Sequence, residues 1–283
     1  MNIIADPGAM QRASDALRRA GKRIAVVPTM GALHEGHLAL LREARRRADA
    51  VIATLFVNPA QFGEGEDLDR YPRNRERDSA LAADAGADIL FTPDPAAMYG
   101  PGYQTWVTVE DVARALEGAA RPGHFRGVAT VVAKLFIITT PQYAVFGQKD
   151  AQQVVVVRRL IRDLGFGIEL VVVPTVREPD GLALSSRNVS LSPEQRKEAP
   201  LLYAALCLAG EMIRTGERNA AAIIRAMHTT IGSRSGGTID YLSVADADTL
   251  RELAQIPAGS TVLVSLAVRF GATRLIDNIL QQA

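Results

Sequence analysis

Two of the chain's four histidines lie close together in the segment PTMGALHEGH, which follows an apolar run and leads into a helical pattern. His34 and His37 are three residues apart, so both rings are expected on one face of the first helical turn. The N–H groups of such a turn have no partner within the helix, and Gly31 permits close approach of the backbone. This combination favours binding of a phosphate chain. The alternatives are two structural histidines or a zinc pair, although no further cluster of Cys or His ligands is evident.

Two further polar segments also follow apolar runs. FVNPAQF carries Asn58 and Gln61, neutral groups that could orient a carboxylate or hydroxyl substrate without adding charge. A turn that merely ends a strand explains this segment equally well. FGQKDAQQ carries Lys149, a flexible ammonium group, and Asp150, for which a helix N-cap is a better interpretation than a ribose ligand.

A later loop, REPDGLALSSRN, ends with hydroxyl and guanidinium donors. Ser185, Ser186 and Arg187 together suit the binding of an oxyanion, although such a loop by itself is usually just solvated. The segment GHFRG begins a further helical pattern. His124 and Arg126 could form a basic rim there, but a turn and helix cap are the favoured interpretation.

The elements that would position these groups alternate in type. Short runs rich in β-branched residues predict buried strands at residues 23–28, 50–57, 88–92, 142–146 and 168–173. Helical periodicity predicts helices at about residues 37–48, 74–85, 127–138 and 151–164. Gly86 and Gly165 are expected just past two helix ends. The alternation indicates an α/β fold, a parallel sheet with helices on both faces, whose ligands bind beyond the carboxyl ends of the strands.

The pattern changes near residue 175. A loop rich in Ser, Pro, Gly and Arg is followed by two helical stretches and two strand-like runs, at residues 193–215, 219–234, 240–244 and 261–270. The sequence therefore predicts two domains, residues 1–175 and a smaller α+β domain at residues 176–283.

Composition is that of a globular protein. The 283 residues are 48% hydrophobic and 22% charged, which argues against disorder. The 32 basic and 31 acidic residues give a net charge of +1, so neither nucleic-acid nor membrane binding is expected. No apolar run approaches the ~18 residues that span a bilayer, and the first residues lack a secretory pattern. A cytoplasmic protein is expected, with the single cysteine, Cys207, as a small buried hydrophobe.

Taken in chain order, with GHFRG third, the five polar segments resemble the pantoate–β-alanine ligase (pantothenate synthetase) family, and RLIDN near the C-terminus matches as well. HxGH alone would indicate only the wider nucleotidyltransferase superfamily. The resemblance implies a Rossmann-like first domain and a two-step reaction. ATP and (R)-pantoate would give pantoyl-adenylate and pyrophosphate, and β-alanine would then displace AMP to give pantothenate, the precursor of coenzyme A. The resemblance also implies that the protein requires Mg²⁺ and forms a homodimer.

The resemblance also implies roles for individual residues. The implied ATP site consists of Met30, Gly31, His34, His37, Gly147, Gln148, Lys149, Asp150, Val176, Leu184, Ser185, Ser186 and Arg187. The implied pantoate site consists of Gln61, Gln153 and Asn58, with Gln61 also near β-alanine. His37 matches the family's catalytic histidine, and His34, Lys149 and Arg187 are expected to assist it.

Three residues depart from the family pattern. Ala60 replaces a frequent Thr, Leu184 replaces a frequent Met, and Arg77 stands where an acidic residue often precedes the Asp matched by Asp78. The first two positions contribute backbone, so those changes are expected to be neutral. Because of the third, the protein ligands of Mg²⁺ are left unassigned, and the ion is expected on phosphates and water.

The residues fit the implied chemistry. Pantoate's carboxylate is ionised near neutral pH and needs no general base, so the absence of a nucleophilic triad motif is expected. The acceptor of the β-alanine proton is not identified. An adenylyltransferase of the same superfamily is the nearest alternative, but the neutral side chains of Asn58, Gln61 and Gln153 do not suit a phosphorylated second substrate. A nucleotide-sensing protein without turnover is the other alternative, and the intact His34, His37, Lys149 and Arg187 argue against it.

Overall fold

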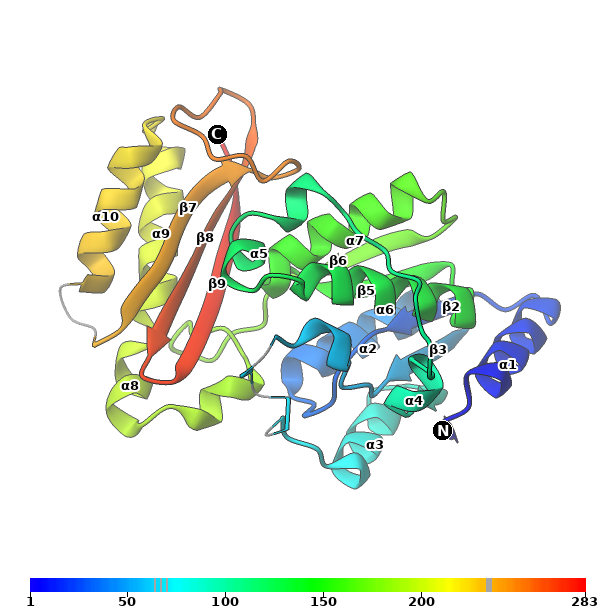
Figure 1. Cartoon of the computed structure of the whole chain (residues 1–283). Coiled ribbons are helices and arrows are strands. Elements are labelled where there is room, and N and C mark those ends of the chain that lie inside the picture. Colours follow the sequence, from blue (N-terminus) through cyan, green and yellow to red (C-terminus); the bar gives the residue numbers. More distant parts are fainter. Residues whose placement is uncertain (64, 67, 70, 233–235) are drawn as a thin grey trace. The chain divides into compact units, whose positions relative to one another are not determined.

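The computed structural model describes residues 1–63, 65, 66, 68, 69, 71–232 and 236–283 (Figure 1). The chain forms two compact units. The first unit is Met1–Gly147 with Gln153–Pro174, and the second unit is Gln148–Gln152 with Thr175–Ala283. The short segment Gln148–Gln152 therefore belongs to the second unit although its chain neighbours on both sides belong to the first. The sequence pattern predicts one domain boundary near residue 175. It gives no sign that Gln148–Gln152 belongs to the second unit.

A parallel sheet of six strands forms the centre of the first unit, which confirms the predicted α/β class. The strands are β1 (Asn2–Ile4), β2 (Ile24–Val27), β3 (Ala50–Thr54), β4 (Ile89–Phe91), β5 (Tyr143–Gly147) and β6 (Glu169–Val173). Their order across the sheet is β1-β4-β3-β2-β5-β6, and each neighbouring pair is parallel. Strand β1 was not predicted, because it is short and largely exposed and so has no apolar run.

Helices connect these strands. They are α1 (Pro7–Arg19), α2 (Glu35–Arg47), α3 (Arg75–Asp84), α4 (Pro95–Met98), α5 (Glu117–Ala120), α6 (His124–Thr139) and α7 (Ala151–Asp163), with the 3₁₀ turns η1 (Pro59–Gln61), η2 (Asp111–Ala113) and η3 (Gln148–Asp150). Gly86 and Gly165 have positive φ just past α3 and α7, as predicted. Helix α1 was missed because its buried residues are only Met10 and Ser14, too few for an apolar stripe.

Both faces of this sheet are covered. Ala25 and Val27 of β2 are buried with Leu41 of α2 in one core cluster. Ile24 and Val26 are equally buried and, by alternation along the strand, point to the other face. Helices α1 and α6 contact each other and β2, and they cover that second face. Continuous burial of β2 explains its unbroken apolar sequence.

The order of the strands defines where a ligand is expected. The chain moves outward from β2 through β3 to β4, and then returns to add β5 on the other side of β2. Strand order therefore reverses between β2 and β5, and ligands of such sheets bind beyond the strand ends at this switch point. The HxGH segment follows β2, and Asn58 follows the adjacent β3.

The second unit is an antiparallel sheet on which helices α9 (Leu201–Arg214) and α10 (Ala220–Gly232) pack. Its strands are β7 (Thr238–Asp246), β8 (Thr261–Phe270) and β9 (Thr273–Gln282), and its other helical elements are the turn η3, η4 (Ser186–Ser190) and α8 (Pro193–Glu198). This confirms the predicted smaller α+β part. The single helix predicted at 193–215 is two helices, because Pro200 has no N–H to continue the first. The end predicted at residue 234 lies outside the described residues.

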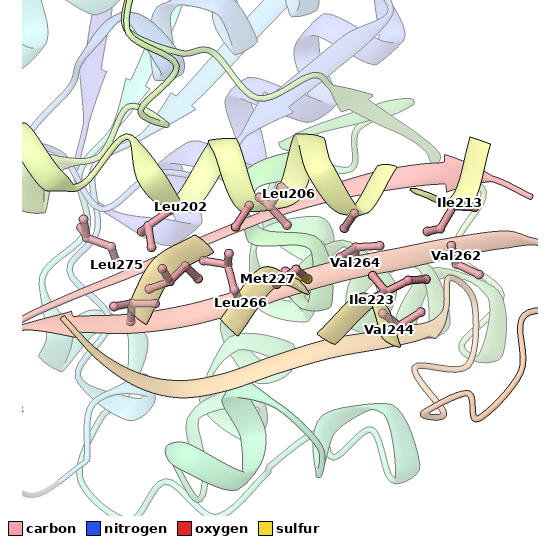
Figure 2. Close-up of a cluster of buried hydrophobic side chains, with 14 of the residues drawn as sticks. Leu202, Leu206, Ile213, Ile223, Met227, Val244, Val262, Val264, Leu266 and Leu275 are labelled. Carbon is pink, nitrogen blue, oxygen red and sulfur yellow. The ribbon is translucent and has the colours of Figure 1, made fainter. Parts of the chain in front are cut away.

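Helices α9 and α10 bury apolar side chains against this sheet (Figure 2). Leu206 and Met227 of the two helices meet Val264 and Leu266 of β8 in the core. The prediction that Cys207 is buried is wrong: it is exposed. The buried stripe of α9 runs through Leu202, Ala205, Leu206, Ala209 and Ile213, and residue 207 falls beside it.

Among the described helices, none combines the length and apolar character required to cross a bilayer.

Candidate active site

The paired histidines form the N-terminus of α2. His34 is the N-cap, and its Nδ1 accepts the N–H of Gly36 at 3.2 Å. Nδ1 of His37 accepts the N–H of His34 at 3.3 Å, and the ring centroids are 4.1 Å apart. The predicted convergence of the two rings is therefore present. Since Nδ1 of each ring is an acceptor, a neutral ring carries its proton on Nε2.

One detail of the predicted phosphate site is wrong. The N–H groups of the first turn of α2 were expected to be unpaired, but the N–H of Gly36 is taken by His34 Nδ1 and that of His37 by the His34 carbonyl, at 2.8 Å. An imidazole nitrogen acts here as the capping acceptor, the role usually taken by Ser, Thr or Asp.

A buried aspartate holds the loop before His34. Asp78 of α3, 2% exposed, accepts the N–H groups of Ala32 and Leu33, each at 2.8 Å. Ala32 has a φ of 52° and Gly31 a φ of 90°, so the loop has a shape that few residues adopt. Arg77, the departure from the family pattern, lies 3.9 Å from the Asp78 carboxylate. In the sequence, Asp78 matched an aspartate of the family pattern but was assigned no role.

Asn58 is the N-cap of η1 and Gln61 its last residue, and both are buried. Asn58 Nδ2 donates to Gln61 Oε1 at 3.0 Å and to the carbonyl of Gly127 at 3.2 Å. Asn58 Oδ1 accepts the hydroxyl of Tyr99 at 2.8 Å. The amide of Asn58 therefore orients Gln61 and ties η1 to α6.

Gln61 joins two of the predicted segments. Its Nε2 lies 3.1 Å from Sδ of Met30, which places a neutral amide beside the HxGH loop. Gln153, the other predicted amide, is half-buried on α7 in the same unit. The close approach at η1 requires a glycine at position 127, where a Cβ would lie 2.1 Å from the carbonyl oxygen of Ala60.

A network of charged and imidazole side chains contacts the backbone carbonyl of Gln61. His124 Nδ1 lies 2.8 Å from the Gln61 carbonyl, and Arg121 Nη2 lies 3.3 Å from the same oxygen. Arg121 also forms a bidentate pair with Glu66, at 2.6 and 2.7 Å. Burial lowers the pKa of His124, and the positive charge of Arg121 lowers it further. Arg126 instead stacks over Trp106 at 4.4 Å, so these two residues of GHFRG have different partners.

Lys149 and Asp150 lie in the second unit, on η3. Lys149 Nζ is 3.9 Å from the Asp150 carboxylate, and Asp150 directly precedes α7. Asn278 of β9 donates to the carbonyls of Gln148 and Lys149 at 3.0 and 2.8 Å. The RLIDN motif thus has a structural partner in the FGQKD motif, a link that the sequence alone did not indicate.

The SSRN loop of the second unit is also ordered by internal hydrogen bonds. Leu184 N–H donates to the Val176 carbonyl at 3.0 Å, which folds the loop back on itself. Ser185 caps η4, its hydroxyl accepting the N–H of Arg187 at 3.2 Å. Asn188 Nδ2 donates to the Ala183 carbonyl at 3.1 Å.

This fold and these motifs define a class of protein, a Rossmann-like parallel α/β sheet with an HxGH loop after its strand β2. The particular family follows from the sequence match. The family model described as pantoate-beta-alanine ligase matches residues 2–280, and the chain belongs to that family.

Individual relatives agree with this assignment. The chain is 54% identical over 278 residues to the pantothenate synthetase of Desulfatibacillum aliphaticivorans, with 98% of each chain covered. It is similar to the crystal structure of pantothenate synthetase from Thermus thermophilus, with a TM-score of 0.91, 49% identity and 99% of each chain covered. A pantoate-beta-alanine ligase from Francisella tularensis, complexed with beta-gamma ATP and beta-alanine, matches at 33% identity, a TM-score of 0.79 and coverage of 99% of this chain and 97% of that one.

Proposed function

We propose that this chain condenses (R)-pantoate with β-alanine, using ATP, through a pantoyl-adenylate intermediate. The observation that carries the proposal is the neutral Gln61 amide beside the HxGH loop, 3.1 Å from Met30. An amide can orient a substrate carboxylate without the charge that a phosphorylated substrate would require. Family membership over residues 2–280 supports the same substrates.

The first step needs no general base. The pantoate carboxylate attacks the α-phosphorus of ATP, an oxygen–phosphorus bond forms, and the bond to the β-phosphate oxygen breaks as pyrophosphate leaves. Two anions must meet, so the barrier is chiefly positional and electrostatic. We assign His37, His34, Lys149 and Arg187 to stabilising the transferring phosphoryl group and the leaving pyrophosphate.

The remaining residues bind the substrates. Gln61 and Gln153 hold pantoate, and Asn58 orients Gln61 through the 3.0 Å hydrogen bond between their side chains. ATP is bound through Met30, Gly31, Gly147, Gln148, Asp150, Val176, Leu184, Ser185 and Ser186, together with the four charged or imidazole groups above.

Magnesium would accompany the phosphates of ATP. Asp78 is a carboxylate next to the HxGH loop, but both its oxygens accept backbone N–H groups at 2.8 Å. It is therefore already engaged and is a poor candidate for a metal ligand. Phosphate oxygens and water suit Mg²⁺ as principal ligands, and the ion would neutralise phosphate charge.

In the second step, the β-alanine amine attacks the acyl carbon and AMP leaves. The amine must first lose a proton, because alkylammonium groups have pKa values near ~10. The acyl-adenylate also needs shielding from water. We propose that the C-terminal part, from residue 176, closes over the site with the Val176–Asn188 loop. By resemblance to the family, we further propose a homodimer in the cytoplasm.

An assay with all substrates tests this function. Purified protein with ATP, Mg²⁺, (R)-pantoate and β-alanine should form pantothenate and AMP in equal amounts, and omission of any substrate should abolish pantothenate. A stable adenylylated product formed without any amine would instead indicate a plain adenylyltransferase. ATP binding without any product would indicate a nucleotide sensor.

A further inference from the structure

Two adjacent residues of β9, Asp277 and Asn278, are buried polar groups on a strand. Their exposures are 3% and 4%. Successive side chains of a strand point to opposite faces of the sheet. Leu275 belongs to the core beneath α9 and α10, so Asp277 shares that face, and Asn278 faces the opposite side. Burial of such groups is costly unless they are hydrogen-bonded, and both are.

Asn278 uses its whole side-chain amide on one short segment. The Nδ2 group donates to the carbonyls of Gln148 and Lys149, at 3.0 and 2.8 Å. Its Oδ1 accepts Nε2 of Gln148 at 3.0 Å. Three hydrogen bonds thus hold η3, a single turn that belongs to the second unit although the chain on both sides of Gln148–Gln152 belongs to the first.

Asp277 binds the loop at Arg177, which leads to the second segment assigned to ATP binding. Its carboxylate accepts both Nη groups of Arg177, at 2.5 and 3.0 Å. Arg177 also donates to the Gly181 carbonyl at 3.1 Å and stacks on Tyr203 of α9 at 3.7 Å. Arg177 lies in the loop that leads to Ser185, Ser186 and Arg187. The adjacent residues Asp277 and Asn278 of β9 therefore hold two different segments, the loop at Arg177 and the turn η3, which lie far apart in the sequence.

We propose that Asn278 is a positioning residue for Lys149, holding the lysine backbone so that its ammonium group meets the phosphates of ATP. This inference rests on the proposed function. The ammonium is carried on a long flexible stem, and a fixed backbone restricts the volume that it samples. The side chain of Asn278 acts on the site through Gln148 and Lys149.

A double-mutant cycle separates positioning from general stability. Asn278→Asp keeps the shape and the acceptor for Gln148, but it turns a carboxylate oxygen toward two carbonyls. The expected result is a loss on the order of 10²-fold in the rate of pantoate-dependent pyrophosphate–ATP exchange, as for a misplaced catalytic group. In a Lys149→Ala background the same change should have little further effect, because coupled residues are not additive.

A control variant and a second measurement accompany the cycle. Asn219→Asp adds the same charge at an exposed position of the second unit and keeps the cap in which Asn219 Oδ1 accepts the N–H of Ala222, at 3.1 Å. It should retain wild-type exchange. Amide hydrogen exchange across residues 149–152, measured without substrates, should accelerate in Asn278→Asp and not in Asn219→Asp.

The outcomes are distinct. Equal loss from Asn278→Asp in the wild-type and Lys149→Ala backgrounds would overturn the proposal, as would unchanged amide exchange at residues 149–152. If the wild-type protein shows no pantoate-dependent exchange, the proposed function fails. The amide measurement still decides whether Asn278 anchors the lysine segment.

Discussion

At the scale of single residues, the imidazoles of His34 and His37 serve the fold and the proposed chemistry at once. Each Nδ1 accepts a backbone N–H, which orients the ring and leaves the proton of a neutral ring on Nε2. A donor held in this way can stabilise charge that develops during phosphoryl transfer without rearranging. A histidine that only capped the helix would be replaceable by other capping residues.

We predict that His37→Ala slows adenylate formation on the order of 10²–10³-fold, the usual cost of removing one such donor. Pantoate affinity should change far less, because the pantoate site is assigned to amides. Single-turnover measurements and pantoate titrations test this. His228→Ala, which removes an exposed histidine of α10, is the matched control and should retain wild-type rates. A defect confined to pantoate affinity would refute the assignment.

His124 makes stability depend on pH. Burial and Arg121 lower its pKa in the folded protein below the ordinary value of about 6.5. As the pH falls below about 6.5, the unfolded chain takes up a proton before the folded protein does, so the free energy of unfolding decreases until the folded-state pKa is passed. This contribution is fully present above pH 6.5 and is lost on acidification.

His124→Asn tests this linkage, because asparagine can offer an N–H to the Gln61 carbonyl but does not titrate. Denaturant unfolding of both proteins should show a smaller loss of stability for the variant as the pH is lowered below about 6.5. Parallel curves for the two proteins would show that His124 is not the titrating group.

At the scale of elements, the sequence predicted most strands and helices because buried parallel strands and amphipathic helices leave clear periodic patterns. β9 was missed because Asp277 and Asn278 interrupt its apolar alternation, and the reason for burying them lies in Arg177 and η3. Cys207 was predicted to be buried, but on α9 its neighbour Leu206 is the buried residue. These features depend on tertiary partners that no local pattern reveals.

The contact between α3 and the HxGH loop gives a prediction at this scale. Asp78→Ala leaves the N–H groups of Ala32 and Leu33 without their 2.8 Å acceptors. Leu33 is buried and Ala32 half-buried, and an unpaired buried N–H costs about 1–3 kcal/mol. We expect lower stability in denaturant unfolding and, because the loop carries His34, a slower first step. Asp84→Ala, exposed on the same helix, should change stability by less than about 0.5 kcal/mol. Equal stability of the two variants would contradict this role of Asp78.

At the scale of the whole molecule, the residues assigned to ATP come from both compact units. His34 and His37 belong to the first unit, whereas Lys149 and Arg187 belong to the second. The motifs were recognisable in the sequence because each combines unusual residue types in a short span. The membership of Lys149 in the second unit could not be predicted, since the partner of its backbone, Asn278, lies more than a hundred positions away.

Substrates should therefore order the second unit's loop. We predict that ATP with pantoate slows amide exchange across Val176–Asn188, because closure would shield these amides from water. The loop at residues 247–260 of the same unit serves as an internal control and should exchange at an unchanged rate. Identical exchange of Val176–Asn188 with and without substrates would count against closure.

The most direct test of the account is pyrophosphate–ATP isotope exchange with purified protein, Mg²⁺ and (R)-pantoate, with β-alanine withheld. Reversible formation of pantoyl-adenylate predicts exchange that depends on pantoate, followed by release of AMP and pantothenate once β-alanine is added. An absence of pantoate-dependent exchange from protein that still binds ATP would contradict the adenylate mechanism.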